Sequence, residues 1–237
     1  MHSRNTIFEQ SSKGTTLRAF VVNQDKHLAG ETVGEWVSLP TTRETLLGVF
    51  QRIGVEDGYY SITDYDSSEF PKLTDYFGEY EDLDELNYLA AKLQDVSQNS
   101  VLTDEFSAAL EIGKDAGSAK DLINLTAPYN LNNRTMLIGV CNDEELGRQI
   151  VKEGKYDLES MGELAQYIDY EALGRDTRIN EGGIFTNRGY FTSNSDGLYE
   201  FYKSVEDIPQ EYLITVDATQ TAAEAMAENM SAGMTMG

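Results

Sequence analysis

Carboxylates are the residues of this sequence with the greatest capacity for chemistry. The 237 residues include 41 Asp and Glu against 18 Lys and Arg, which gives a formal net charge of −23. Two carboxylates at a suitable separation can serve as the acid and base of a glycosidase. The sequence does not fix any such separation, so an acidic hydrolase is kept only as an alternative.

A calcium loop is the other chemistry that closely spaced carboxylates suggest. Asp64, Asp66 and Ser68 occupy alternate positions, as at the start of an EF-hand loop. The sixth position holds Glu69 where the loop needs glycine, and the twelfth holds Asp75 where it needs glutamate. We therefore expect no metal site.

Nucleophiles and bases of other catalytic types are scarce. His2 and His27 fall in a polar terminus and a predicted loop, and Cys141 follows an apolar run where a small core residue is expected. A single cysteine also excludes an intramolecular disulfide. The sequence contains no phosphate-binding loop and no G-x-G-x-x-G, H-E-x-x-H or G-x-S-x-G motif. We expect no catalytic residue and no cofactor, and hence a protein that is not an enzyme.

The negative charge is concentrated in three blocks. Residues 54–91 carry a net charge of −10, residues 142–176 of −6 and residues 196–237 of −7, while the segments between them are nearly neutral. A solvated surface is the ordinary explanation of such a block. Residues 54–91 also contain eight aromatic residues, which we expect to fold the segment and hold its charges in place. Its eleven acids are Glu56, Asp57, Asp64, Asp66, Glu69, Asp75, Glu79, Glu81, Asp82, Asp84 and Glu85.

This charge also excludes several classes of partner. A strongly negative protein is not expected to bind nucleic acid directly or to adhere to an anionic membrane. No run of about 18 apolar residues is present that could span a membrane. The first twenty residues are interrupted by charges and do not resemble a secretory signal. A cytoplasmic protein is therefore expected.

The first part of the chain has the pattern of a small β-β-α-β unit. Residues 17–22 and 35–39 are expected to form strands joined by a hairpin loop. Thr41 and Glu44 have the spacing of a capping box, and the helix that follows should end at Gly54. Residues 59–64 alternate like a further strand of the same sheet.

Helices dominate the pattern from about residue 80 to residue 130. Residues 83–93 have an amphipathic spacing with acids in the first turn, which favours a helix. Thr103 is a candidate cap for a helix ending at Gly113, Ser118 is the cap of another, and Pro128 should close the stretch.

The last part returns to mixed structure. Residues 136–140 are expected to form a buried strand or extended connector, and Asn142 should cap a helix that stops at Gly154. Ser160 should cap the next helix, with Leu164, Tyr167, Ile168 and Leu173 on its apolar face. Residues 182–191 have the pattern of a hairpin, and the last nineteen residues that of a frayed helix or tail.

Together these elements predict an α+β fold: an N-terminal antiparallel sheet with one helix, a central helical part and a C-terminal α+β part. The expected divisions are a flexible N-terminus (1–16), an N-terminal α/β domain (17–79), a central helical domain (80–135), a C-terminal α+β domain (136–202) and an acidic C-terminal extension (203–237).

Several segments, in order along the chain, resemble a known family. Residues 164–176 (LAQYIDYEALGRD), with the glycine-rich hairpin at residues 182–186, resemble the C-terminal signature of the ArdA antirestriction proteins. The other segments that follow the family pattern are residues 28–40 with their Gly-x-Trp element, residues 56–66, the 83–93 helix with Asn87, and residues 136–154.

The resemblance implies a function that agrees with the charge. ArdA proteins come from plasmids, transposons and phages, and they protect DNA from type I restriction–modification enzymes. The resemblance implies a homodimer in which each subunit is an elongated chain of three small domains. This dimer would imitate duplex DNA and occupy the enzyme's DNA groove, both in the methyltransferase core and in the whole complex. An acidic mimic or interaction module directed at another basic nucleic-acid-binding or defence protein is the alternative.

The family pattern also suggests which residues carry this function. It places the DNA-mimic face on the eleven acids of residues 54–91, extended by Asp143, Glu144 and Glu145. Helix capping is an equally good explanation for Asp82, Asp84 and Asn142, and core packing for Tyr167, Ile168 and Leu173. The antirestriction motif near the dimer contact would comprise Tyr167, Ile168, Asp169, Tyr170, Glu171, Leu173, Arg175 and Asp176.

Overall fold

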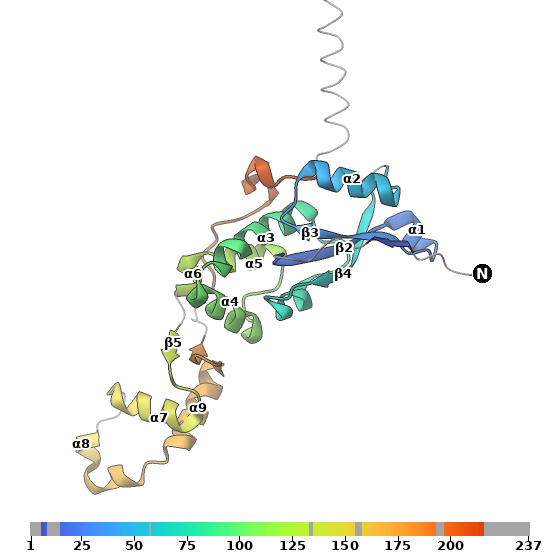
Figure 1. The fold of residues 1–237 in the computed structure, drawn as a ribbon. Helices are drawn as coiled ribbons and strands as arrows, with labels where there is room; N and C mark the ends of the chain where they lie inside the picture. The colour runs from blue at the N-terminus through green and yellow to red at the C-terminus, as the bar shows by residue number, and fades with distance from the viewer. Residues whose placement is uncertain are drawn as a thin grey trace, which may run out of the picture. The chain divides into compact units, whose positions relative to one another are not determined.

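The computed structural model describes residues 6–8, 15–56, 58–132, 135–154, 158–192 and 197–215 (Figure 1). The chain has the expected α+β architecture. Its contacts define two compact units, one formed by Met1–Gln94 with Tyr202–Gly237 and the other by Asp95–Phe201. A division into three domains is therefore not confirmed, and the two units are described separately.

A four-stranded sheet forms the centre of the first unit. Its strands are β1 (Thr6–Phe8), β2 (Leu17–Asn23), β3 (Val33–Leu39) and β4 (Tyr60–Asp66), in the order β1-β3-β2-β4. The central strand β2 is antiparallel to both β3 and β4, whereas β1 is parallel to β3. The three strands expected from the sequence are confirmed. Strand β1 lies within residues 1–16, for which the sequence predicted a flexible N-terminus and no strand.

Helix α2 (Arg43–Ile53) covers one face of the sheet with Leu46, Val49 and Ile53, and it ends at Gly54 as predicted (Figure 1). Its cap is Thr42, whose hydroxyl accepts a hydrogen bond from the Thr45 amide. The predicted capping box is therefore one residue out of place, because the backbone of Thr41 is bonded to Asn87 instead. A short helix, α1 (Gln24–Leu28), lies within the predicted hairpin loop.

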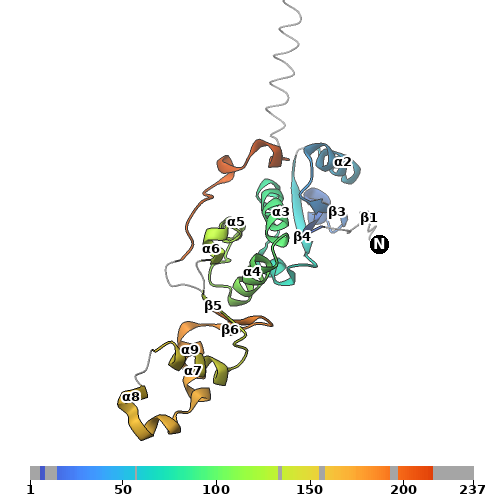
Figure 2. The same cartoon turned by 60° about the vertical axis from the view of Figure 1, so that its left-hand side comes forward.

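Two further segments complete the first unit. The short helix η1 (Pro71–Tyr76) leads to α3 (Leu83–Ser97), whose leucines at 83, 86, 89 and 93 are fully buried as their spacing predicted. The described chain ends in residues 202–215, here called the C-terminal strap, which contain η3 (Val205–Asp207) and η4 (Gln210–Tyr212). The strap runs back to α3 (orange to red in Figure 2).

The second unit begins with three helices, α4 (Ser100–Ile112), α5 (Ala119–Leu125) and α6 (Pro128–Asn132). The predicted stop at Gly113 and the predicted cap at Ser118 are confirmed. Asn99 rather than Thr103 caps α4, since its side chain accepts from the amides of residues 101 and 102. Pro128 opens a helix instead of closing the stretch, a position that suits proline because the first turn leaves amides unbonded anyway.

A small sheet and a helix pair form the rest of this unit. The elements are β5 (Thr135–Ile138), α7 (Asp143–Lys152), α8 (Leu158–Met161), η2 (Gly162–Tyr167), α9 (Tyr170–Glu181), β6 (Ile184–Phe185) and β7 (Gly189–Thr192). The sheet order is β5-β7-β6, so the predicted hairpin is confirmed. The single helix predicted from Ser160 is wrong, because the chain bends after η2 and α9 starts anew at an Asp169 cap.

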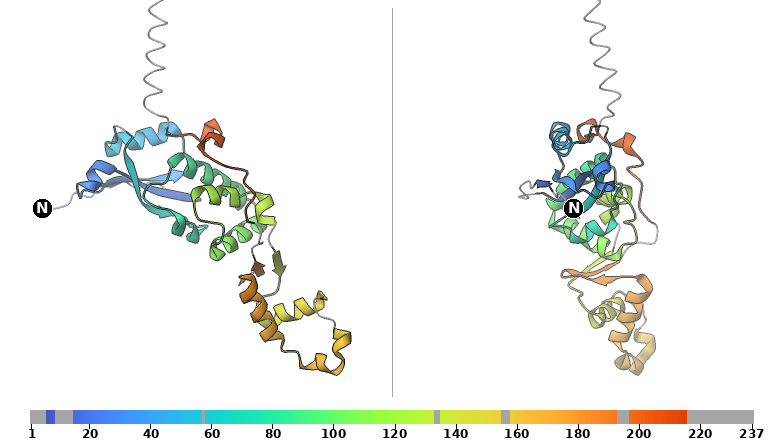
Figure 3. Two further views of the ribbon diagram at one scale, coloured as in Figure 1. Left: turned by 180° about the vertical axis from the view of Figure 1, so that it is seen from behind. Right: turned by 90° about the vertical axis from the view of Figure 1, so that its right-hand side faces the viewer.

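Helices α7 and α9 cross at two glycines (yellow and orange in Figure 3). A Cβ atom on Gly174 would lie 1.8 Å from the Asp143 carbonyl oxygen, and one on Gly147 would lie 1.9 Å from that of Tyr170. Only residues without a side chain allow the two backbones to approach this closely.

Candidate functional site

Acidic side chains of the first unit are exposed along one continuous stretch of chain. Strand β4, the η1 segment and the loop before α3 carry them between residues 64 and 85. Exposed carboxylates in the 54–91 block are those of Glu56, Asp64, Asp66, Glu69, Asp75 and Glu79, and Glu81, Asp82 and Glu85 are half-buried. Asp57 lies outside the described residues.

Few of these charges are neutralised by a cation. Asp66 is 3.5 Å from Arg18, its partner across the sheet, and Asp75 is 3.2 Å from Lys72. Among the residues that the structure describes, no Lys or Arg pairs with Glu69 or Glu79. The stretch therefore keeps most of its negative charge at the surface.

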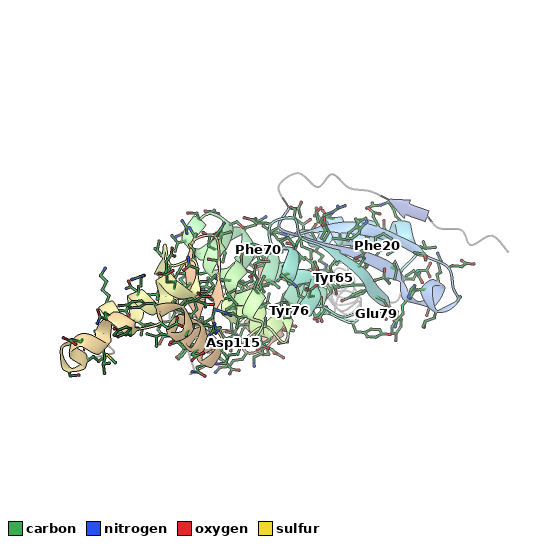
Figure 4. All side chains as sticks on the ribbon, turned by 90° about the horizontal axis from the view of Figure 1, so that it is seen from below. Phe20, Tyr65, Phe70, Tyr76, Glu79 and Asp115 are labelled. Atoms are coloured by element: carbon green, nitrogen blue, oxygen red, sulfur yellow. The ribbon has the colours of Figure 1, made fainter. Side chains whose placement is uncertain are left out.

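Aromatic residues attach this acidic stretch to the sheet. The Tyr65 hydroxyl donates to the Gly78 carbonyl at 2.7 Å, and its ring lies 4.8 Å from that of Phe77. The Ile62 amide donates to the Glu79 carbonyl at 3.0 Å, so the loop lies along the free edge of β4. An open hollow of about 230 Å³ lies between strand and loop, near the Tyr65 and Glu79 labels of Figure 4. These bonds agree with the expectation that aromatics hold the charges in place.

Two acids at the start of α3 are bonded in different ways. Asp82 caps the helix by accepting from the amides of Asp84 and Glu85 at 2.7 and 3.2 Å. Asp84 is only 5% exposed and accepts hydrogen bonds from the C-terminal strap. It is therefore buried and is not one of the exposed acids of this stretch.

The tyrosines around this turn lie in a negative field. Burial, with further contributions from Asp82 and Asp84, raises the pKa of Tyr60 to about 12. Burial is also the main reason that the pKa of Tyr65 is raised, and the charge of Glu81 adds to the effect. These phenols are neutral near pH 7 and act as hydrogen-bonding anchors rather than acids or bases.

The three acids at the start of α7 are held by other groups. Asp143 forms a two-bond ion pair with Arg178, at 2.8 and 3.1 Å, which lowers the pKa of its carboxyl group. Glu144 pairs with Arg148 at 2.7 Å, and Glu145 accepts from the Cys141 amide. Asn142 caps this helix as predicted. These acids therefore offer less uncompensated charge than the stretch in the first unit.

The predicted antirestriction motif covers the end of η2 and the first half of α9. Tyr167 is 76% exposed, so core packing does not explain it, whereas Ile168 and Leu173 are half-buried. The Tyr170 ring lies under the Arg148 guanidinium at 4.5 Å. Glu171, Arg175 and Asp176 are exposed.

Other candidate sites give no further chemistry. Cys141 is exposed, so its prediction as a core residue is wrong; it stands at the turn into α7 rather than in β5. Within the described ranges, no group of three or more His, Cys, Asp or Glu residues is arranged to hold a metal ion. No helix in the same ranges is both long and apolar enough to cross a membrane.

Comparison with known proteins gives one informative result. A family model described as antirestriction protein (ArdA) matches residues 19–192, and no curated protein gives a significant match. The matched residues include most of β2, all of β3, β4 and α3, both glycines of the α7–α9 crossing and the β6–β7 hairpin. Because the match covers well over half of the sequence, the chain belongs to the ArdA family of antirestriction proteins.

Proposed function

We propose that this chain inhibits type I restriction–modification enzymes by presenting carboxylates in place of DNA phosphates. The inhibitor occupies the DNA groove of the methyltransferase core and of the whole complex, without turnover and without a cofactor. The observation that carries the proposal is the run of exposed, largely unpaired acids between residues 64 and 85, held on folded elements of an antirestriction protein.

The physical basis is competition for a basic groove. Duplex DNA presents one negative charge per roughly 1.7 Å, and proteins that bind it line their grooves with Lys and Arg. Carboxylates can replace phosphates there if they are already fixed, because ordering a flexible side chain on binding costs about 0.5–1.5 kcal/mol. The Tyr65 bond to Gly78 and the Asp82 cap fix the loop and the start of α3 in advance.

We also propose that the antirestriction motif and the residues just before it contribute to a homodimer. Met161, Leu164 and Tyr167 are exposed large apolar side chains close together in sequence, and Leu164 and Tyr167 are 69% and 76% exposed. Burial of such groups against a second copy of the chain favours association. A dimer doubles the net charge to about −46, which equals the charge of about 23 base pairs of DNA.

A competition assay tests the central proposal. Purified full-length protein is titrated into a complex of a type I methyltransferase with labelled duplex DNA at low salt, and DNA release is measured. We expect release at a stoichiometric excess and inhibition of both methylation and cleavage. A protein that leaves the DNA bound at every concentration would refute the proposal.

Charge reversal tests which acids form the proposed DNA-mimic face. The test variant changes Asp64, Glu69 and Glu79 to Lys; the control changes Glu31, Glu44 and Glu111, which are exposed acids elsewhere in the chain. Both variants change the net charge by the same amount. We expect the test variant to weaken inhibition about tenfold or more and the control to have a much smaller effect. Equal losses in both variants would mean that only net charge matters.

A further inference from the structure

The C-terminal strap lies beyond the residues that match the family, yet it is packed firmly onto the first unit. Its residues Tyr202, Ile208 and Ile214 are buried, at 5% exposure or less. The family match ends at residue 192, so the strap is an addition to the part of the chain that defines the family. Its contacts with α3 suggest what it does.

Asp84 provides the main attachment. One of its carboxylate oxygens accepts hydrogen bonds from the Ile214 amide and, at 2.8 Å, from the Thr215 amide. The other oxygen accepts from the Thr215 hydroxyl. A carboxylate that is buried in this way is bound to the strap and cannot also contact a partner protein.

Asn87, one helical turn further along α3, provides the second attachment. Its side-chain amide donates to the Tyr212 carbonyl at 3.0 Å and to the Thr41 carbonyl at 3.3 Å, and its oxygen accepts from the Thr41 amide at 2.7 Å. The Tyr88 ring contacts both Tyr202 and Tyr212, with centroids 5.9 and 5.5 Å apart. The strap, α3 and the segment before α2 are thereby joined (Figure 2).

The strap also orients an acid of the proposed face. The Tyr202 hydroxyl donates to Glu85 at 2.6 Å, which fixes a carboxylate that would otherwise choose among several rotamers. Asp82, which caps the same turn, is held by two backbone amides. Every acid in the first turn of α3 therefore has a defined position while the strap is docked.

We propose that residues 202–215 form a clasp that positions the acidic first turn of α3 for partner binding, with Asp84 as its anchor. Asp84 is a positioning residue: it acts through its hydrogen bonds to the strap, not through its own charge. The consequence for binding rests on the proposed function, whereas the clasp itself does not.

Two substitutions of Asp84 separate the anchor from the charge. Asp84→Asn and Asp84→Ala remove the same charge, but the amide oxygen of Asn can still accept from the Ile214 and Thr215 amides. The NH₂ group of Asn can donate to the Thr215 hydroxyl, which is able to accept. Asp95→Ala is the control, since Asp95 is an exposed acid on the same helix.

Amide hydrogen exchange and DNA competition are measured on all three full-length variants. In Asp84→Ala we expect the Ile214 and Thr215 amides to exchange at least about tenfold faster and inhibition to weaken about three- to tenfold. Asp84→Asn and Asp95→Ala should stay within about twofold of the parent in both measurements. Unchanged protection in Asp84→Ala would overturn the clasp. Equal loss of inhibition in Asp84→Asn and Asp84→Ala would show that the charge matters instead.

Two provisions keep these results decisive. If Asp84→Ala does not fold, Thr215→Pro removes both the amide and the hydroxyl that residue 215 donates to Asp84, without changing α3. The Ile214 amide should then still exchange faster, and normal protection of that amide would overturn the clasp. If the parent protein fails to displace DNA, the proposed function falls, and the exchange measurements alone decide whether the clasp exists.

Discussion

At the scale of single residues, the ion pair of Asp143 with Arg178 makes a pH-dependent contribution to stability. Arg178 lowers the pKa of Asp143 in the folded protein, so the pair stabilises the fold at neutral pH. This contribution is lost as the pH falls below about 4 and through the folded-state pKa. We expect Arg178→Gln to lower the free energy of unfolding by about 1 kcal/mol at pH 7 and by progressively less in acid.

Urea denaturation at a series of pH values measures this difference. Lys72→Gln is the control, because Lys72 and Asp75 form a pair in which both side chains are more than half exposed. Such a pair contributes only about 0.5 kcal/mol or less. A gap between the parent protein and Arg178→Gln that persists unchanged into acid would contradict the assignment.

Tyr60 makes the opposite kind of contribution, at alkaline pH. Its pKa is raised to about 12 in the fold, so the neutral phenol stabilises the protein below about pH 10. That stabilisation is lost as the pH rises from about 10 toward 12. We expect absorbance at 295 nm to show two groups of tyrosines, of which the second ionises only with unfolding of the protein. Tyr60→Phe should reduce that second group by one.

At the scale of secondary-structure elements, the crossing of α7 and α9 depends on its two glycines. Gly174→Ala would place a Cβ atom 1.8 Å from the Asp143 carbonyl oxygen, a backbone atom that cannot move away cheaply. We expect a loss of about 3 kcal/mol or more in the second unit. Gly48→Ala in α2 is the control: its Cβ would meet only the end of the Arg52 side chain, and alanine favours the helix. Thermal unfolding of the two variants compares them.

The elements that the sequence predicted correctly are those specified by neighbouring residues. The caps at Ser118 and Asn142 and the stops at Gly54 and Gly113 depend on contacts within three or four positions, so the pattern was sufficient. At Thr41 a distant residue bonds the backbone, and there the predicted cap was wrong. Thr41 is bonded to Asn87 across 46 positions, and the cap moved to the next threonine.

The candidate site was predictable to the same extent. The distribution of charge along the sequence was enough to single out the acids of residues 54–91, and most of them are exposed. Asp84 is buried because it accepts hydrogen bonds from residues 214 and 215, which lie about 130 positions away. No pattern in the sequence around Asp84 indicates that contact. The exposure of Leu164 and Tyr167 was missed for a related reason, since their helical spacing suggested a core that the break after η2 does not provide.

At the scale of the whole molecule, association should depend on the exposed apolar side chains of η2, the segment that leads into the motif. Leu164→Glu places a charge where we propose that a second copy packs, and it should shift the protein from dimer to monomer. Tyr59→Glu is the control, because Tyr59 is similarly exposed, at 64%, in the first unit. Sedimentation at micromolar concentration distinguishes the two states. A parent protein that is already monomeric, or a Leu164→Glu variant that stays dimeric, would place the dimer contact elsewhere or remove it.

The salt dependence of inhibition is set by the charge of the whole inhibitor. DNA gains affinity by releasing counterions condensed on its closely spaced phosphates. The carboxylates of this chain are interrupted by neutral segments, and some are paired with cations, so they condense fewer ions than a duplex. Inhibitor binding should therefore weaken with salt, but with a shallower slope of log affinity against log salt than DNA shows for the same enzyme.

In a competition assay, less inhibitor should then be needed to displace half of the DNA at 200 mM salt than at 50 mM. If the amount of inhibitor needed to displace half of the DNA rose with salt, the carboxylates would gain nothing over phosphates. The advantage of the inhibitor would then have to come from apolar contacts.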